Sequence, residues 1–201
     1  MITSTSLVYS QNLSTITKKK RLSKFERSKL TIENPLSEII IGLLLGDGHI
    51  QKRSLTGNSR FIYGQSSLRI QHFNYFNHVL ELIKPYLSKE FKLKTRSFVD
   101  KRTNNSYSYS SVNFATLSLP CFNYYKNLFY NSDGLKIVPS NIQNLFSPRG
   151  LASWIKVDGS IQNKGLHLNT YGRFSGQPRY FKFKLFFRNF VWRKYLEMFN
   201  T

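Results

Sequence analysis

An apolar stretch that ends in a single acid constrains this chain more than any other feature. The stretch, SEIIIGLLLGDGHI, spans residues 37–50 and holds Asp47 between two glycines. An Asn-Pro pair at 34–35 precedes it, and an Asx cap followed by proline is a typical helix start. Gly48 can end a helix in the left-handed conformation. The pattern therefore predicts a buried helix over residues 35–47.

A second stretch, LASWIKVDG at 151–159, repeats this plan. It follows Ser147 and a proline, and its acid, Asp158, again precedes a glycine. Both copies carry a small residue five positions before the acid, Gly42 in the first and Ser153 in the second. One apolar segment with an Asp-Gly turn is a weak signal. Two copies with matching offsets favour a repeated structural unit.

Small residues in the two stretches predict that their helices pack together. Gly42 and Gly46 are four positions apart and so lie on one helix face. Small residues at this spacing let two helix backbones approach closely. We expect Asp47 and Asp158 to meet where the helices end. The predicted interface residues are Gly42, Gly46, Ser153 and Val157.

Two carboxylates at neighbouring helix ends predict a cation. A helix C-terminus carries about half a negative charge, which disfavours an acid there. A divalent cation removes this conflict, and carboxylates and the carbonyls of Gly46 and Val157 are oxygen ligands suited to Mg²⁺. Beside a phosphodiester, such an ion activates water and stabilises the leaving oxygen.

The charge of the chain narrows the choice of partner. There are 30 Lys and Arg against 10 Asp and Glu, a formal net charge of +20. Such an excess favours a phosphate polyanion or an anionic membrane surface. The longest apolar run, about 39–46, is well short of the roughly 20 residues of a membrane span. Cys121 is the only cysteine, which excludes an internal disulfide.

The remaining patterns predict an αββαββα order and an antiparallel sheet with a polar, basic open face. Strands are predicted over SLRIQH (67–72), EFKLKTRSFV (90–99) and YSYSSVNFATLSL (107–119), and helices over 73–87 and 120–131. In the second of these strands Leu93 is expected to point inward, away from the basic residues. Antiparallel sheets commonly keep one face open. The fold class is therefore α/β, more narrowly α+β.

The chain divides into three predicted parts. Residues 1–33 are a basic, flexible segment, which serves as a presequence, a nucleic-acid arm or a solvated tail. Residues 34–146 form the first repeat, and residues 147–201 form a second, incomplete repeat. In this last part RYFKFKLFF (179–187) predicts one basic strand, with a short helix after it.

The two stretches resemble the repeated motif of the LAGLIDADG homing endonucleases, of the double-motif kind encoded in fungal mitochondrial introns. GLLLGDGHI matches the first motif, GLASWIKVDGS the second, and LKIVPSNIQNLFSPRGLASW the usual approach to the second. The resemblance covers about residues 36–170. It implies two pseudosymmetric halves in one monomer, which grip the DNA major groove with saddle-shaped sheets and cut both strands at a long target site.

The resemblance also implies roles for particular residues. Asp47 and Asp158 bind Mg²⁺ and are catalytic, and Lys136 polarises the reacting water or stabilises transition-state charge. His49 is taken as an incidental polar residue. The implied DNA contacts are Arg53, Arg60, Gln65, Arg69, Gln71, Lys92, Lys94, Arg96, Lys101 and Arg102.

Two other functions remain open on the same fold. An intron maturase, which binds RNA and supports splicing, needs the basic surface but not the acids. An inactive remnant of an endonuclease fits the short second repeat. The expected localisation is the mitochondrion, and no membrane partner is expected.

Overall fold

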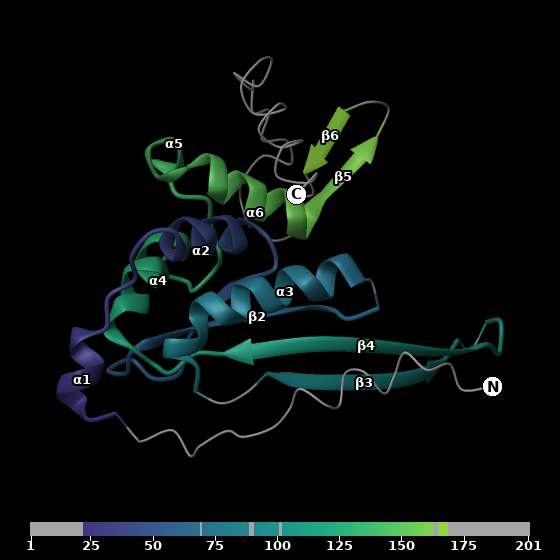
Figure 1. The fold of residues 1–201 in the computed structure, drawn as a ribbon, viewed down its shortest axis with the longest axis horizontal. Helices are drawn as coiled ribbons and strands as arrows, with labels where there is room; N and C mark the ends of the chain where they lie inside the picture. Colours follow the sequence, from purple (N-terminus) through teal and green to yellow (C-terminus); the bar gives the residue numbers. More distant parts are fainter. Residues whose placement is uncertain (1–21, 69, 89–90, 101, 163–164, 169–201) are drawn as a thin grey trace.

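The protein is built on a four-stranded antiparallel sheet that carries helices on one face (Figure 1). The computed structural model describes residues 22–68, 70–88, 91–100, 102–162 and 165–168. The main body consists of α2 (Leu36–Leu45), β1 (His49–Lys52), β2 (Ser59–Ser66), α3 (Ile70–Ile83), β3 (Lys92–Val99), β4 (Ser106–Ala115) and α4 (Asn123–Phe129). This succession confirms the predicted αββαββα order.

Shorter elements join and flank this body. Single 3-10 turns, η2 (Lys84–Tyr86) and η3 (Pro120–Phe122), follow α3 and β4. Before the body lies α1 (Lys24–Lys29), and after it come α5 (Ile142–Leu145), α6 (Pro148–Asp158), β5 (Gly159–Gln162) and β6 (Gly165–Leu168). The helix–hairpin order of α6, β5 and β6 repeats that of α2, β1 and β2.

The sheet has the strand order β1-β2-β4-β3, and its two faces differ in chemistry. Along β2, Phe61 and Tyr63 are buried under the helices, while Arg60 points to the open face. Lys92 and Lys94 pair with residues 113 and 111 of β4, which in turn pair with residues 64 and 66 of β2. Directly paired residues share a face, so both lysines lie on the open face.

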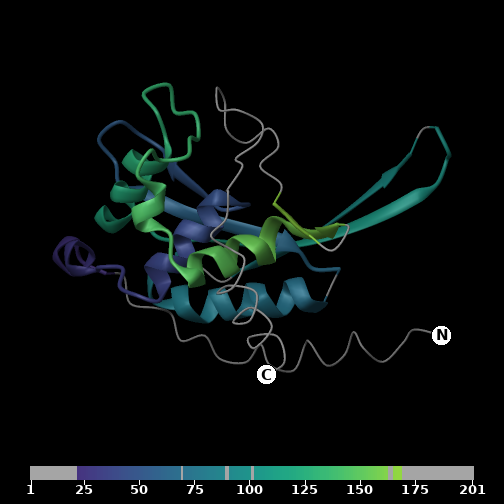
Figure 2. The ribbon, with the colours of Figure 1, turned by 90° about the horizontal axis from the view of Figure 1, so that it is seen from above.

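The β3–β4 hairpin extends beyond the helices (Figure 2). Leu93, expected to point inward, is 62% exposed because it lies on the edge strand β3, although its partner Val112 on the inner strand β4 is 1% exposed. The open face therefore continues past the core of the molecule.

The strand predicted over 67–72 is wrong. β2 ends at Ser66, and α3 begins at Ile70. Leu68 and Ile70, whose alternation suggested the strand, are 63% and 50% exposed. Two apolar positions are too few to distinguish a strand from the approach to a helix.

The predicted buried helix is α2, which ends at Leu45, two residues earlier than expected. Ile40, Leu43 and Leu44 are completely buried, so this helix is the centre of the core. Gly48 is not left-handed, because Gly134 is the only glycine with positive φ in the described residues. Glycine is required at position 48 by close packing instead, since a Cβ there would lie 2.8 Å from the Leu43 carbonyl oxygen.

The structure describes part of the predicted N-terminal segment but none of the strand predicted near the C-terminus. Part of the segment predicted to be flexible forms α1, which begins with a capping box between Ser23 and Glu26. The basic strand over 179–187 and the helix after it lie outside the described residues. In the part of the chain that the structure describes, no helix has the length and apolarity to cross a membrane.

Candidate active site and nucleic-acid interface

Helices α2 and α6 pack against each other along the small-residue faces identified in the sequence (Figure 1). A Cβ added to Gly42 would lie 2.8 Å from the Ser153 Cβ. One turn later, a Cβ added to Gly46 would lie 3.0 Å from Val157 Cγ1. The backbones are thus close enough that side chains at the two glycine positions would collide with α6.

This packing brings the two predicted acids to one place. Asp47 lies in the turn that follows α2, and Asp158 is the last residue of α6. A Cβ on Gly46 would lie only 2.9 Å from Asp158 Oδ2, so the Asp158 carboxylate rests on the backbone one residue before Asp47. Both acids are half-buried.

A buried tyrosine beneath the helix ends is a site residue that the sequence did not reveal. Burial raises the pKa of Tyr63 far above its usual range, and Tyr75 and the carboxylates of Asp47 and Asp158 raise this pKa further. Negative charges act in this way only over short distances, so both acids lie near the same phenol. The sequence offered one sign of this role: Tyr63 lies two residues after Phe61 on the buried face of β2 and carries a hydroxyl into the core.

Lys136 lies directly against the turn that holds Asp47. Its Nζ donates hydrogen bonds to the carbonyl oxygens of Gly46, at 3.0 Å, and Gly48, at 2.8 Å. The ammonium therefore brackets the acid through its two flanking peptide groups. The Gly46 carbonyl accepts a hydrogen bond here, while its role as a metal ligand, like that of the Val157 carbonyl, stays a prediction.

The donor set suits a hard divalent cation. In the described residues, no group of three or more His, Cys, Asp or Glu side chains is arranged to hold a metal. The candidate ligands are thus the carboxylates of Asp47 and Asp158 with backbone carbonyls. Mg²⁺ is commonly held by one or two carboxylates and keeps several waters, so these residues fit magnesium better than zinc or calcium.

His49, taken as incidental from the sequence, begins β1 next to this site. Burial lowers the pKa of its imidazole, and the positive charges of Lys136 and Arg60 lower that pKa further. The neutral imidazole is therefore favoured in the folded protein.

The open face of the sheet carries four of the ten predicted DNA contacts, Arg60, Lys92, Lys94 and Arg96. Arg60 donates from Nε to Gln51 Oε1 at 2.9 Å, which fixes its guanidinium on this face. The exposed predicted contacts are Arg53 after β1, Lys92, Lys94 and Arg96 on β3, and Arg102 in the β3–β4 turn. Arg69 and Lys101 lie outside the described residues.

Two predicted DNA contacts are not on this face. Gln65 is 7% exposed and points toward the helices, where its Oε1 accepts a 3.0 Å hydrogen bond from the Tyr63 hydroxyl. Gln65 is therefore not on the open face with Arg60, because side chains alternate along β2 and these two residues are five positions apart. Gln71 is exposed, but on the first turn of α3 instead of on a strand.

Comparison with known proteins identifies the family. A family model described as the LAGLIDADG DNA endonuclease family matches residues 37–178. The chain belongs to this family. The match includes both acid-ended stretches, so the LAGLIDADG resemblance expected from the sequence is confirmed.

Curated LAGLIDADG relatives include proteins named for two activities. The chain is 30% identical over 142 residues to cytochrome b mRNA maturase bI2 of Saccharomyces cerevisiae, covering 66% of this chain and 31% of that protein. It is also 30% identical over 139 residues to DNA endonuclease I-ChuI of Chlamydomonas applanata, covering 66% of this chain and 61% of that protein. The chain thus spans less than two thirds of the length of these relatives.

A solved structure supports the LAGLIDADG fold. The homing endonuclease I-WcaI, bound to its DNA recognition sequence, superposes with a TM-score of 0.57 at 20% identity. The match covers 70% of this chain and 60% of that one. The mixed architecture of helices and an open antiparallel sheet is therefore that of a homing endonuclease.

Proposed function

We propose that this chain is a site-specific DNA endonuclease that makes Mg²⁺-dependent double-strand cuts at a long target. The observation that carries the proposal is the approach of the Asp158 carboxylate to the Gly46 backbone, beside Asp47. Two acids from two copies of one motif thus share a site. A purely structural helix pair would gain nothing from two carboxylates at its negatively polarised ends.

In this proposal each residue of the site has a separate task. Asp47 and Asp158 hold the divalent ion, which supplies an activated water and stabilises the leaving oxygen when it is bound. Lys136 holds the turn of Asp47 and offers positive charge near the reacting phosphate. Tyr63 keeps a neutral hydroxyl beneath the acids at all ordinary pH values, because its pKa is strongly raised.

The open face is the proposed DNA surface. Lysines suit phosphates, while arginines also suit guanine edges in the major groove. Lys92, Lys94 and Arg96 lie along one strand on this face, and Arg60 lies two strands away. One monomer with two pseudosymmetric halves would use this sheet for half of the target.

An intron maturase is the second candidate, because two curated relatives are named cytochrome b mRNA maturase. RNA would then occupy a basic surface, and cleavage would not be required. The same names support a mitochondrial localisation, since they refer to cytochrome b mRNA.

Cleavage of the intron-free allele of the host gene, with and without Mg²⁺, tests the endonuclease proposal. Asp47→Asn is expected to lower the single-turnover rate by at least about 100-fold and to leave DNA affinity nearly unchanged. The matched control is Glu81→Gln, which also converts a carboxylate to an amide but lies exposed on α3 beside Lys84.

The result separates the two candidates. A rate that survives Asp47→Asn refutes the assignment of the acids. Absence of cleavage by the unmodified chain, together with splicing support that persists in Asp47→Asn, favours the maturase.

A further inference from the structure

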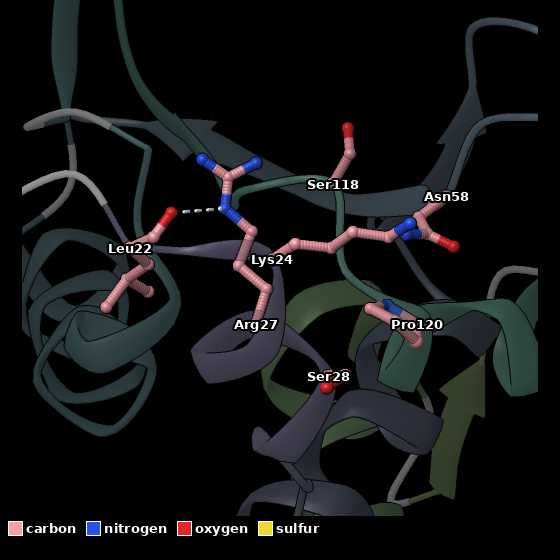
Figure 3. A pocket seen from close by; sticks show the side chains of 7 residues that line it. All are labelled: Leu22, Lys24, Arg27, Ser28, Asn58, Ser118 and Pro120. Atoms are coloured by element: carbon pink, nitrogen blue, oxygen red, sulfur yellow. Dashed lines mark hydrogen bonds between the residues drawn. The ribbon is translucent and has the colours of Figure 1, made fainter.

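A cationic pocket lies beside α1, away from the two acids. Its lining residues are Leu22, Lys24, Arg27, Ser28, Asn58, Ser118 and Pro120 (Figure 3). They come from α1 and the residue two before it, from the β1–β2 loop, and from the segment between β4 and α4. The pocket is at the end of the sheet opposite the tip of the β3–β4 hairpin (Figure 1).

The pocket lining is positively charged and contains no acid. In the described part of the chain neither Lys24 nor Arg27 forms an ion pair. The nearest acid in sequence, Glu26, is engaged elsewhere, because its carboxylate accepts a 2.7 Å hydrogen bond from the Ser23 backbone N–H. Two positive charges are thus left without neutralisation inside one hollow.

The polar groups of the pocket are held as donors. The Arg27 Nε donates to the Leu22 carbonyl oxygen at 3.1 Å, which leaves the two terminal nitrogens of the guanidinium for a ligand. In Figure 3 the guanidinium and the Ser118 hydroxyl point to the same side, and Lys24 extends toward Asn58. The Asn58 Oδ1 already accepts from Asn123 Nδ2 at 3.0 Å, so its amide nitrogen remains for the pocket.

The pocket has room for a phosphate. Its volume is about 380 Å³. An ammonium, a guanidinium fork, an amide and hydroxyls are the groups with which proteins bind backbone phosphates.

We propose that this pocket binds a phosphodiester phosphate of a nucleic acid, as an anchoring site separate from the open face of the sheet. The proposal rests on the nucleic-acid binding proposed above and not on cleavage. Duplex DNA that continues past the sheet and intron RNA present the same phosphate group. The phosphate group that both nucleic acids share defines the site. Binding to a DNA duplex and to a single-stranded RNA identifies which of them the pocket holds.

The test compares two lysines of the same helix in the full chain. Lys24→Gln removes a charge from the pocket, whereas Lys29→Gln removes one outside it, where the Lys29 ammonium lies 4.2 Å from the centroid of the Phe25 ring. Affinity for a random-sequence DNA duplex and for a single-stranded RNA is measured across a salt series. Loss of one phosphate contact lowers the slope of log affinity against log salt by about 0.9 on duplex DNA and about 0.7 on a single strand.

We expect Lys24→Gln to show this smaller slope and Lys29→Gln to keep the slope of the unmodified chain. An effect on the duplex alone identifies DNA as the source of the phosphate, and an effect on the RNA alone identifies RNA. Equal slopes for the two variants on both probes would overturn the proposal.

A second pair of variants tests the same pocket with opposite charge. Ser118→Asp is expected to weaken binding several-fold more than Ser118→Ala, because it adds an acid among the donors. Equal binding by these two variants would also overturn the proposal. The slope measurements require no cleavage, so a failure of the anchoring site is distinguishable from a failure of the endonuclease assignment.

Discussion

The position of Asp47 depends on its neighbours more than on the aspartate itself. Gly46 leaves room for the Asp158 carboxylate, and Gly48 leaves room for the Leu43 carbonyl. Lys136 then fixes both flanking carbonyl oxygens. The two glycines and the Lys136 ammonium thus position the turn that carries the acid at the end of an apolar helix.

His49 is expected to make folding stability depend on pH. Its pKa is lowered by burial and by Lys136 and Arg60, so below its ordinary pKa of about 6.5 the unfolded chain binds a proton that the folded chain does not. Stability therefore falls as the pH is lowered through this range. His49→Gln should reduce that fall.

Urea unfolding at a series of pH values measures this effect. At about pH 8 the imidazole is neutral in both states, and the difference between His49→Gln and the unmodified chain serves as the reference. If the two stability curves stay parallel down to about pH 5, the predicted coupling is absent.

The contact between α2 and α6 is the element-scale feature on which the candidate site depends. Glycine is unfavourable inside a helix by about 1 kcal/mol relative to alanine, so Gly42 lowers the intrinsic stability of α2. Close packing against Ser153 and Val157 compensates for this cost. An ion pair between Glu38 and Arg149 at 2.8 Å joins the other end of the two helices.

Gly42→Ala is expected to destabilise the protein despite the better helix propensity of alanine. The added methyl group would lie 2.8 Å from the Ser153 Cβ and closer still to the Gly150 carbonyl oxygen. Overpacking of this kind costs roughly 1–3 kcal/mol. The midpoint of urea unfolding should therefore be lower than that of the unmodified chain. Cleavage of the proposed DNA target should also be slower, because the added methyl group displaces the helix ends that carry the acids.

Ser153→Ala is the control for this substitution, because it adds no volume to the interface. It removes one hydrogen bond, from the Ser153 hydroxyl to the Arg149 carbonyl, and should cost no more than about 1.5 kcal/mol. A Gly42→Ala protein as stable as the unmodified chain would show that the helices can separate without loss.

Helices and strands were predicted correctly from the sequence where a long apolar pattern, or a motif present in two copies, supported the prediction. Helices α2, α3 and α6 and the β3–β4 hairpin were all expected, but only α6 has the predicted side-chain cap, because the N-cap residue of α2, Pro35, makes no side-chain hydrogen bond. The strand over 67–72 failed because its alternation was too short. Gln65 was named from the family resemblance alone, which does not fix the face of β2 on which a residue lies. Tyr63 was missed since its importance arises from three-dimensional proximity to two acids distant in the chain.

The whole molecule separates its charges from its core. Helices cover one face of the sheet, so the basic strands are left accessible on the other (Figure 1). With a formal net charge of +20, the chain should bind polyanions over a broad surface. The arrangement explains why a protein with so many cations still has a continuous apolar interior.

DNA affinity is expected to fall steeply with salt, and Lys94 should contribute to this dependence. Lys94→Gln removes a charge from the open face and should reduce the slope of log affinity against log salt by about 0.9. Lys84→Gln removes an equal charge from η2, where Lys84 pairs with Glu81 at 3.1 Å, and should leave the slope unchanged. A response to salt that is flat, or the same for both variants, would rule out β3 as a contact surface.

The meeting of Asp47 and Asp158 across the helix pair also sets an order for events during synthesis. Translation delivers the first acid early, together with the entire basic sheet, but the second emerges only after α6 has been made. In the proposed endonuclease, the basic strands would therefore be synthesised before both acids of the site are present. Completion of α6 would then be the step of synthesis that allows the two-acid site to form.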